Sequence, residues 1–132
     1  MARIEPIVVP DSAAPAGHYS AGVRHGGIVY VSGQLGVRPD GTHTADLPFE
    51  EQVRAAMDNV LRVLAAAGLG PEDVIKAIAY VVGVENWPRF NAIYAEAMGA
   101  AKPARVVVPV PELHYGYLIE IEAIADCRDD DL

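Results

Sequence analysis

Apolar residues recur at intervals of three and four in two segments of the chain, which is the spacing of an amphipathic helix. In residues 48–68 the recurring positions are Phe49, Val53, Met57, Val60, Leu61 and Leu64. Acidic residues occupy the first turn of this segment and a glycine ends it, as is common at helix termini. In residues 87–99, Pro88 stands near the first helical position and Gly99 follows the last. We therefore predict two helices.

Five further segments are short, apolar and rich in β-branched residues, which favours strands. They are residues 19–27, 28–37, 74–84, 104–110 and 117–126. Gly26 and Gly27 separate the first two segments and favour a tight hairpin turn. Three prolines near the N-terminus leave that segment irregular or at best an edge strand. Residues 38–48 are predicted to form a loop.

The order strand, strand, helix, strand, helix, strand, strand predicts a single α+β domain over residues 1–132, with both helices packed on one face of a mixed sheet. The opposite face would stay open although it is rich in valine and isoleucine. Apolar faces of this kind are usually covered in oligomers. We therefore expect a homo-oligomer whose sheets face inward.

Composition and charge narrow the function classes. The 18 acidic and 10 basic residues give a formal net charge of −8 without a basic cluster, which disfavours nucleic-acid binding. No apolar stretch is long enough to span a membrane, and the N-terminal segment has prolines and acids where a signal peptide is apolar, so we expect a cytoplasmic protein. The lone cysteine, Cys127, fits a reduced intracellular protein. The four histidines lack the spacing of metal ligands, and we expect no metal.

Residues 117–125, "YLIEIEAIA", place two carboxylates inside an apolar run. Alternation puts Glu120 and Glu122 on one face of this strand, where their burial needs a partner. If residues 104–110 and 117–126 pair as a hairpin around His114, Arg105 lies roughly opposite Glu122 and on the same face. Two interpretations remain open: an interface ion pair, or a site whose guanidinium binds a substrate carboxylate while an acid polarises a water.

Six strings, in this order and spacing, carry a resemblance: "YVSGQLGVRPDG", "NVLRVLAAAG", "EDVIKAIAYV", "FNAIYAEAM", "KPARVVV" and "IEIEAIA". Together they resemble the RidA (YjgF-type) family of enamine and imine deaminases over nearly the whole chain. The resemblance implies a homotrimer of chorismate-mutase-like α+β subunits with active sites in clefts between them and no cofactor. It also implies hydrolysis of reactive 2-enamino or 2-imino acids to 2-keto acids and ammonia.

Matching the family's motifs to this chain gives each candidate residue a role. The resemblance implies that Arg105 of "PAR" binds the substrate carboxylate and that Glu120, the first acid of "EIEA", positions the attacking water. It also implies that four residues line the pocket: Tyr19, Ser32, Gly33 and Asn91. Each of these four has a structural alternative, such as a tyrosine packed at an interface or a small residue required by a turn.

The chain departs from the family's pattern at two places. Val107 stands where active relatives often carry cysteine or a hydroxyl residue, and we expect this change to alter pocket polarity and substrate choice. If a Val107→Cys variant had the same substrate profile as the wild type, that hypothesis would be contradicted. The string "ELHYGYL" and Trp87 add aromatic bulk, which would favour a larger or ring-derived imine if these residues rim the cleft. A dedicated deaminase for an aminomuconate-like imine, or a non-catalytic protein that binds small carboxylates, therefore remains an alternative.

Overall fold

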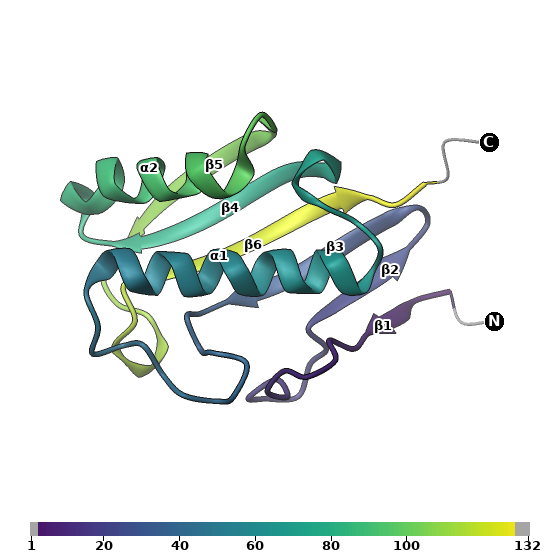
Figure 1. Ribbon diagram of the computed structural model, residues 1–132, viewed down its shortest axis with the longest axis horizontal. Coiled ribbons are helices and arrows are strands. Elements are labelled where there is room, and N and C mark those ends of the chain that lie inside the picture. The colour runs from purple at the N-terminus through teal and green to yellow at the C-terminus, as the bar shows by residue number, and fades with distance from the viewer. Residues whose placement is uncertain (1–2, 129–132) are drawn as a thin grey trace.

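The computed structural model describes residues 3–128 and contains a six-stranded mixed sheet with two helices on one face (Figure 1). The strands are β1 (Glu5–Ile7), β2 (Gly22–His25), β3 (Ile28–Gln34), β4 (Val74–Val82), β5 (Ala104–Val110) and β6 (Ile119–Asp126). The helices are α1 (Phe49–Ala66) and α2 (Trp87–Met98). Three single 3₁₀ turns complete the fold: η1 (Pro71–Asp73), η2 (Val84–Asn86) and η3 (His114–Gly116).

These elements confirm the predicted helices, strands and α+β class. The N-terminal segment contributes β1, which is an edge strand, and residues 38–48 form a loop. Gly26 and Gly27 have φ values of 58° and 83°, so the β2–β3 hairpin turns where the glycine pair predicted it. Gly99 likewise ends α2 with a φ of 63°.

The strand order β1-β2-β3-β6-β4-β5 overturns one prediction. Residues 104–110 and 117–126 do not form a hairpin, because β4 lies between them and pairs with both. The β4–β5 pair is parallel and α2 provides its crossover connection. The chain then passes β4 and enters the gap between β3 and β4 as β6, which is antiparallel to both neighbours. The apolar sequence of β6 suits this central position.

The core lies between the sheet and the helices. From α1 it receives Phe49, Val53, Ala56, Met57, Val60, Val63 and Leu64, which are all buried. From β6 it receives alternate residues, Ile119, Ile121, Ala123 and Ala125, which are also buried. Each large aliphatic side chain buried in this way contributes about 1.5–3 kcal/mol. The odd-numbered positions of β6 therefore face the helices, and the even-numbered ones face the open side.

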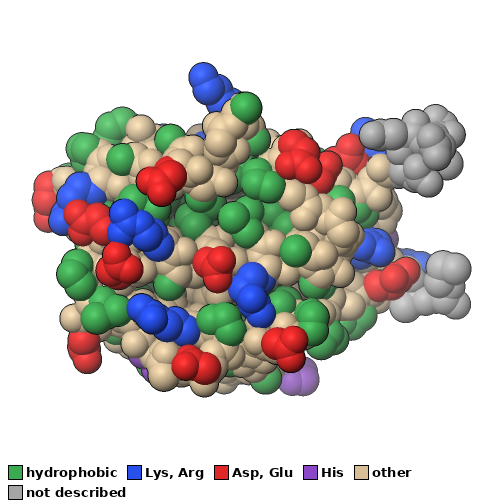
Figure 2. Space-filling model, in the orientation of Figure 1, with side chains coloured by type: hydrophobic (Ala, Val, Ile, Leu, Met, Phe, Trp, Pro, Cys, Tyr) green, Lys and Arg blue, Asp and Glu red, His purple; other side chains and the backbone are tan. Residues whose placement is uncertain are grey.

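The two faces of the molecule differ in polarity. Acidic and basic side chains are interspersed over the outer surface of the helices, which Figure 2 shows. On the open side of the sheet, Tyr30 and Val106 remain 44% and 41% exposed. These two apolar side chains stand on a sheet face that no helix of the described chain covers, as the single helical layer in Figure 1 shows.

Candidate functional site

Glu120 lies near the start of β6 on the open face, directly beside the bare backbone of Gly33. A β-carbon built at Gly33 would stand 2.7 Å from the Oε2 atom of Glu120, so only a glycine leaves room for the carboxylate in this position. The register of β3 against β6 shifts between Val31 and Gln34, which marks an irregularity at Ser32 and Gly33. The "SGQ" string therefore has a local reason: it shapes the end of β3 around the acid.

A neighbouring segment is tied to the same place. The hydroxyl of Ser32 donates a hydrogen bond of 2.6 Å to the carbonyl oxygen of Ser20, and its backbone N–H donates one of 2.9 Å to Ala21. Tyr19, 54% exposed, precedes these acceptors directly. We call Tyr19, Ser32, Gly33 and Glu120 the carboxylate half-site. From the helix side, the buried Gln52 accepts a hydrogen bond of 2.9 Å from the N–H of Leu118, two residues before Glu120.

The electrostatic surroundings of Glu120 favour its neutral form. Burial raises the pKa of this carboxyl above its ordinary value, and the negative charge of Glu122 raises it further, while His114 lowers it. Among residues 3–128, no salt bridge reaches Glu120. A desolvated carboxylate without a salt bridge suits a general base, because its raised pKa lies closer to the working pH.

Glu122 has a different partner from the one predicted. The Tyr80 hydroxyl donates a hydrogen bond of 2.6 Å to Glu122, and this bond raises the pKa of Tyr80. Arg105 pairs with Ala77 of β4 and Glu122 pairs with the next residue, Ile78, so the two charges lie on opposite faces of the sheet. The prediction that they share a face was wrong. The error follows from the misplaced hairpin: β4 separates the two strands and supplies Tyr80.

Arg105 lies on the helix face of β5, opposite to Glu120. It pairs in register with Ala77 of β4, which pairs with Ala123 of β6, and both alanines are buried beneath the helices. Its Nη1 donates a hydrogen bond of 2.8 Å to Oδ1 of Asn91 on α2. Its guanidinium carbon lies 4.9 Å from the centroid of the Tyr94 ring and 5.6 Å from that of Phe90.

A cleft of about 390 Å³ opens beside this arginine, a volume at the small end of the range for small-ligand sites. Its lining comes from α2, the following turn and β5: Asn91, Tyr94, Ala95, Met98, Gly99, Ala101, Lys102, Pro103 and Arg105. We call Asn91, Tyr94, Lys102 and Arg105 the guanidinium half-site. Val107 shares the face of Arg105, where it is half-buried and packs against the core rather than lining the cleft.

The structure thus divides the predicted site residues between two groups, and Val107 belongs to neither of them. Sequence reasoning missed Tyr80, Tyr94 and Lys102. The last two had a weak signal, since Tyr94 follows Asn91 by one helical turn and Lys102 stands just before "PAR". The position of Tyr80 beside Glu122 depends on a strand pairing that spacing alone did not reveal.

The aromatic residues of "ELHYGYL" have unequal roles. Tyr117 is buried, its hydroxyl lies 2.8 Å from Nδ1 of His43, and it accepts a hydrogen bond from the N–H of Thr44. It therefore fastens the loop before α1. Tyr115 is 62% exposed and stacks near His43 with a ring distance of 5.1 Å. Trp87 begins α2 and is absent from the cleft lining, so it does not rim the cleft of a single chain.

Two kinds of feature are absent from the residues that the structure describes. No group of three or more His, Cys, Asp or Glu side chains between residues 3 and 128 is arranged to hold a metal ion. Neither helix in that range combines the length and apolar character needed to cross a membrane.

Comparisons with known proteins place the chain in a family. The family model described as Endoribonuclease L-PSP matches residues 10–127. A RutC family protein of Pyrococcus horikoshii is 36% identical over 121 residues, which cover 92% of this chain and 96% of that one. A 2-iminobutanoate/2-iminopropanoate deaminase of Dermatophagoides farinae is 31% identical over 118 residues, or 89% and 92% of the two chains.

A solved structure agrees. E. coli TdcF with bound serine superposes with a TM-score of 0.86 at 30% identity, over 95% of this chain and 99% of that one. Both the family model and the fold thus extend over nearly the whole chain, as the quoted strings predicted. The chain belongs to the Endoribonuclease L-PSP family, which includes the RidA, YjgF and RutC proteins.

Proposed function

We propose that this chain is an imine deaminase that hydrolyses 2-enamino and 2-imino acids to 2-keto acids and ammonia. The observation that carries the proposal is the free guanidinium of Arg105. Asn91 occupies one of its nitrogens, and no carboxylate of residues 3–128 forms a salt bridge with it. A planar fork of donors held in this way suits the bidentate binding of a substrate carboxylate. The named activity of the Dermatophagoides farinae relative supports the same reaction.

The complete site requires two copies of the chain. Arg105 and Glu120 stand on opposite faces of one sheet, so a single chain does not present both to one small molecule. We propose a homotrimer in which the edge strand β5 of one copy approaches the open face of the next. The apolar side chains exposed on that face, Tyr30 and Val106, support such a contact. The guanidinium half-site of one subunit would then face the carboxylate half-site of its neighbour.

The chemistry proceeds without a strong nucleophile. Protonation of an enamine at its β-carbon gives an iminium whose C2 is electrophilic. Arg105 holds the substrate carboxylate, and Glu120 accepts a proton from a water as the oxygen attacks C2. The protonated Glu120 then gives this proton to the nitrogen. As the C–N bond breaks, Glu120 accepts the proton of the new hydroxyl and returns it to solvent, so that ammonia leaves and a 2-keto acid remains. Orientation provides much of the rate gain, and general-base assistance contributes about 10²- to 10⁴-fold.

A non-catalytic role in binding small carboxylates is the second candidate, because the cleft beside Arg105 holds a cation without an acid, which is enough to bind a carboxylate. Val107 has neither a hydrogen-bond donor nor a thiol, but it packs against the core and does not line this cleft. The reaction described above routes no proton through position 107, so its apolar side chain is also compatible with turnover. The two functions differ in the role of Glu120: the deaminase needs its carboxylate for proton transfer, and a carboxylate-binding protein does not.

The test couples the protein to an amino-acid oxidase that releases imines, with semicarbazide as the trap. Wild-type protein should lower the amount of semicarbazone, and Arg105→Ala and Glu120→Gln should each abolish this effect. Arg54→Ala is the matched control, because Arg54 is an exposed arginine of α1 that belongs to neither half-site. An unchanged semicarbazone yield with wild-type protein, for every amino acid tried, would refute the deaminase and leave the binding role.

A further inference from the structure

The cleft of the guanidinium half-site carries two positive charges and no negative one. Lys102 and Arg105 both line it, and none of its other seven lining residues is ionisable as an acid at neutral pH. This is unexpected in a chain with 18 acidic residues against 10 basic ones. Two cations that share a small cleft repel each other, and an anion bound between them would offset this repulsion.

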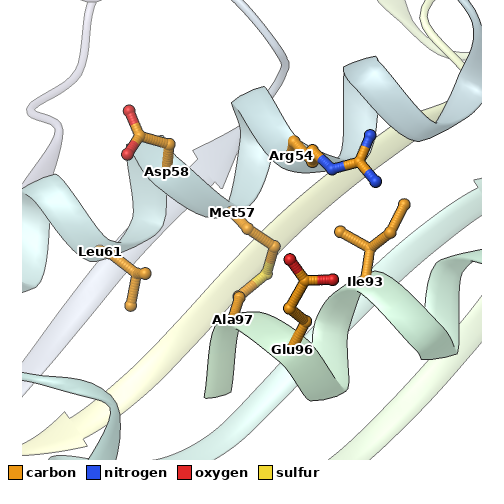
Figure 3. Close-up of a pocket in the computed structure, with 7 residues that line it drawn as sticks. All are labelled: Arg54, Met57, Asp58, Leu61, Ile93, Glu96 and Ala97. Carbon is orange, nitrogen blue, oxygen red and sulfur yellow. The ribbon is translucent and has the colours of Figure 1, made fainter. Parts of the chain in front are cut away.

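Nearby acids do not neutralise the cleft. Glu96 is the acid of α2, but it lines a separate groove of about 210 Å³ between α1 and α2, together with Arg54 and Asp58 (Figure 3). In the part of the chain that the structure describes, Lys102 and Arg105 take part in none of the salt bridges. The cleft therefore has an uncompensated double positive charge, which fits a ligand with two anionic groups.

A third group in the same lining lacks a partner. Tyr94 is only 7% exposed, and its hydroxyl has no hydrogen-bond partner among the described residues. Burial raises the pKa of this phenol, so the hydroxyl keeps its proton and remains a donor. A buried donor without an acceptor is costly, so the wall of this cleft contains a polar group that the single chain leaves unsatisfied.

We propose that Lys102 is a specificity-determining residue that selects 2-imino acids with a second, distal carboxylate. Arg105 binds the carboxylate next to the reacting carbon, and Lys102 binds the distal one. This inference rests on the proposed function. Since imines of this class arise from amino acids, the dianionic substrates are those derived from acidic amino acids. A cleft of about 390 Å³ accommodates such a chain of a few carbons.

Binding of stable keto acids tests the inference independently of turnover. The probes are 2-oxoglutarate, which has the distal carboxylate, and 2-oxobutanoate, which lacks it, and their affinities are measured by titration calorimetry. We expect wild-type protein to bind 2-oxoglutarate at least about tenfold more tightly, the effect of one charge-assisted hydrogen bond. Lys102→Gln should remove this preference by weakening the binding of 2-oxoglutarate much more than that of 2-oxobutanoate, and Lys102→Arg should retain it.

Arg54→Gln is the charge-matched control, since it removes one positive charge from the separate groove of Figure 3. It should leave both affinities unchanged. Equal binding of the two keto acids by wild-type protein would overturn the inference. An unchanged preference in Lys102→Gln would also overturn it, as would a wild-type protein that binds neither probe. Selective binding that depends on Lys102, without hydrolysis of any imine, would support the inference and refute the proposed catalysis.

Discussion

The two half-sites are positioned by different parts of the fold. In the carboxylate half-site, the sheet backbone sets the geometry: Glu120 lies on the central strand β6 and packs beside Gly33 of β3. In the guanidinium half-site, side chains set it: Arg105 lies on the edge strand β5 and is held by the amide of Asn91 and the ring of Tyr94. A central strand fixes its residues on both sides, whereas an edge strand leaves one side for a partner.

The surroundings of the two half-sites also have opposite effects on the charged group: they disfavour the charge of Glu120 and stabilise that of Arg105. Burial raises the pKa of Glu120, so the ionised carboxylate destabilises the folded chain increasingly as the pH rises through that raised value. Arg105 instead gains a hydrogen bond and two ring contacts. The comparison indicates that neither charged group is neutralised by a salt bridge within the described residues, which leaves Arg105 available to a substrate carboxylate and Glu120 available to a proton.

The largest expected effect comes from combining defects in the two half-sites. Arg105→Ala and Glu120→Gln should each lose about 10²- to 10⁴-fold in kcat/KM when tested alone. Co-expressed in equal amounts, the two variants should recover about a quarter of wild-type activity, because half of the chains carry an intact arginine and half of their neighbours an intact glutamate. The measurement is the imine-trapping assay on the purified mixed oligomer.

A doubly substituted chain provides the control. When Arg105→Ala and Glu120→Gln are combined in one chain and mixed with wild type, a site shared between subunits again leaves about a quarter of the activity, whereas a site within one chain leaves about half. Absence of recovery in the first mixture, with half activity in the second, would mean that one subunit contains the whole site.

The next largest effect concerns the placement of Glu120. Gly33→Ala would bring a β-carbon to 2.7 Å from Oε2 of Glu120, and the flexible carboxylate must then move. We expect kcat/KM to fall by about 10- to 100-fold through lost orientation, with little change in thermal midpoint. Gly22→Ala is the contrast, because its β-carbon would meet the backbone oxygen of Tyr30 at 2.9 Å and should destabilise the fold. A Gly33→Ala enzyme with wild-type kinetics would show that the carboxylate needs no exact position.

Local patterns in the sequence predicted the elements but not their neighbours. The spacing of apolar residues gave both helices, and the glycine pair gave the β2–β3 turn, because these signals lie within a few residues. The expected hairpin of β5 and β6 failed because a parallel pair with a helical crossover brings β4 between them. Strand order depends on contacts distant in sequence, which spacing does not encode.

The same limit applies to the candidate site. The resemblance identified Arg105 and Glu120 by motif, and the structure gives each a distinct environment. Alternation correctly placed Glu120 and Glu122 on one face, but the face of Arg105 relative to them depended on the wrong pairing. Lys102 was overlooked because its only signal was its place just before "PAR", and the cleft lining shows that it shares a cleft with Arg105.

The smallest expected effect is a shift in the pH profile of the carboxylate half-site. Activity should fall as the pH falls through the pKa of Glu120, because the base must be ionised. Burial is the main cause that raises this pKa, and Glu122 adds to it while His114 opposes it. Glu122→Gln should therefore move the acidic limb of kcat/KM to lower pH, and His114→Gln should move it to higher pH. Gln at position 122 can still accept the hydrogen bond from Tyr80, which preserves the local structure. If the acidic limb of kcat/KM stayed at the same pH in both variants, a group other than Glu120 would have to be the one whose titration sets this limb.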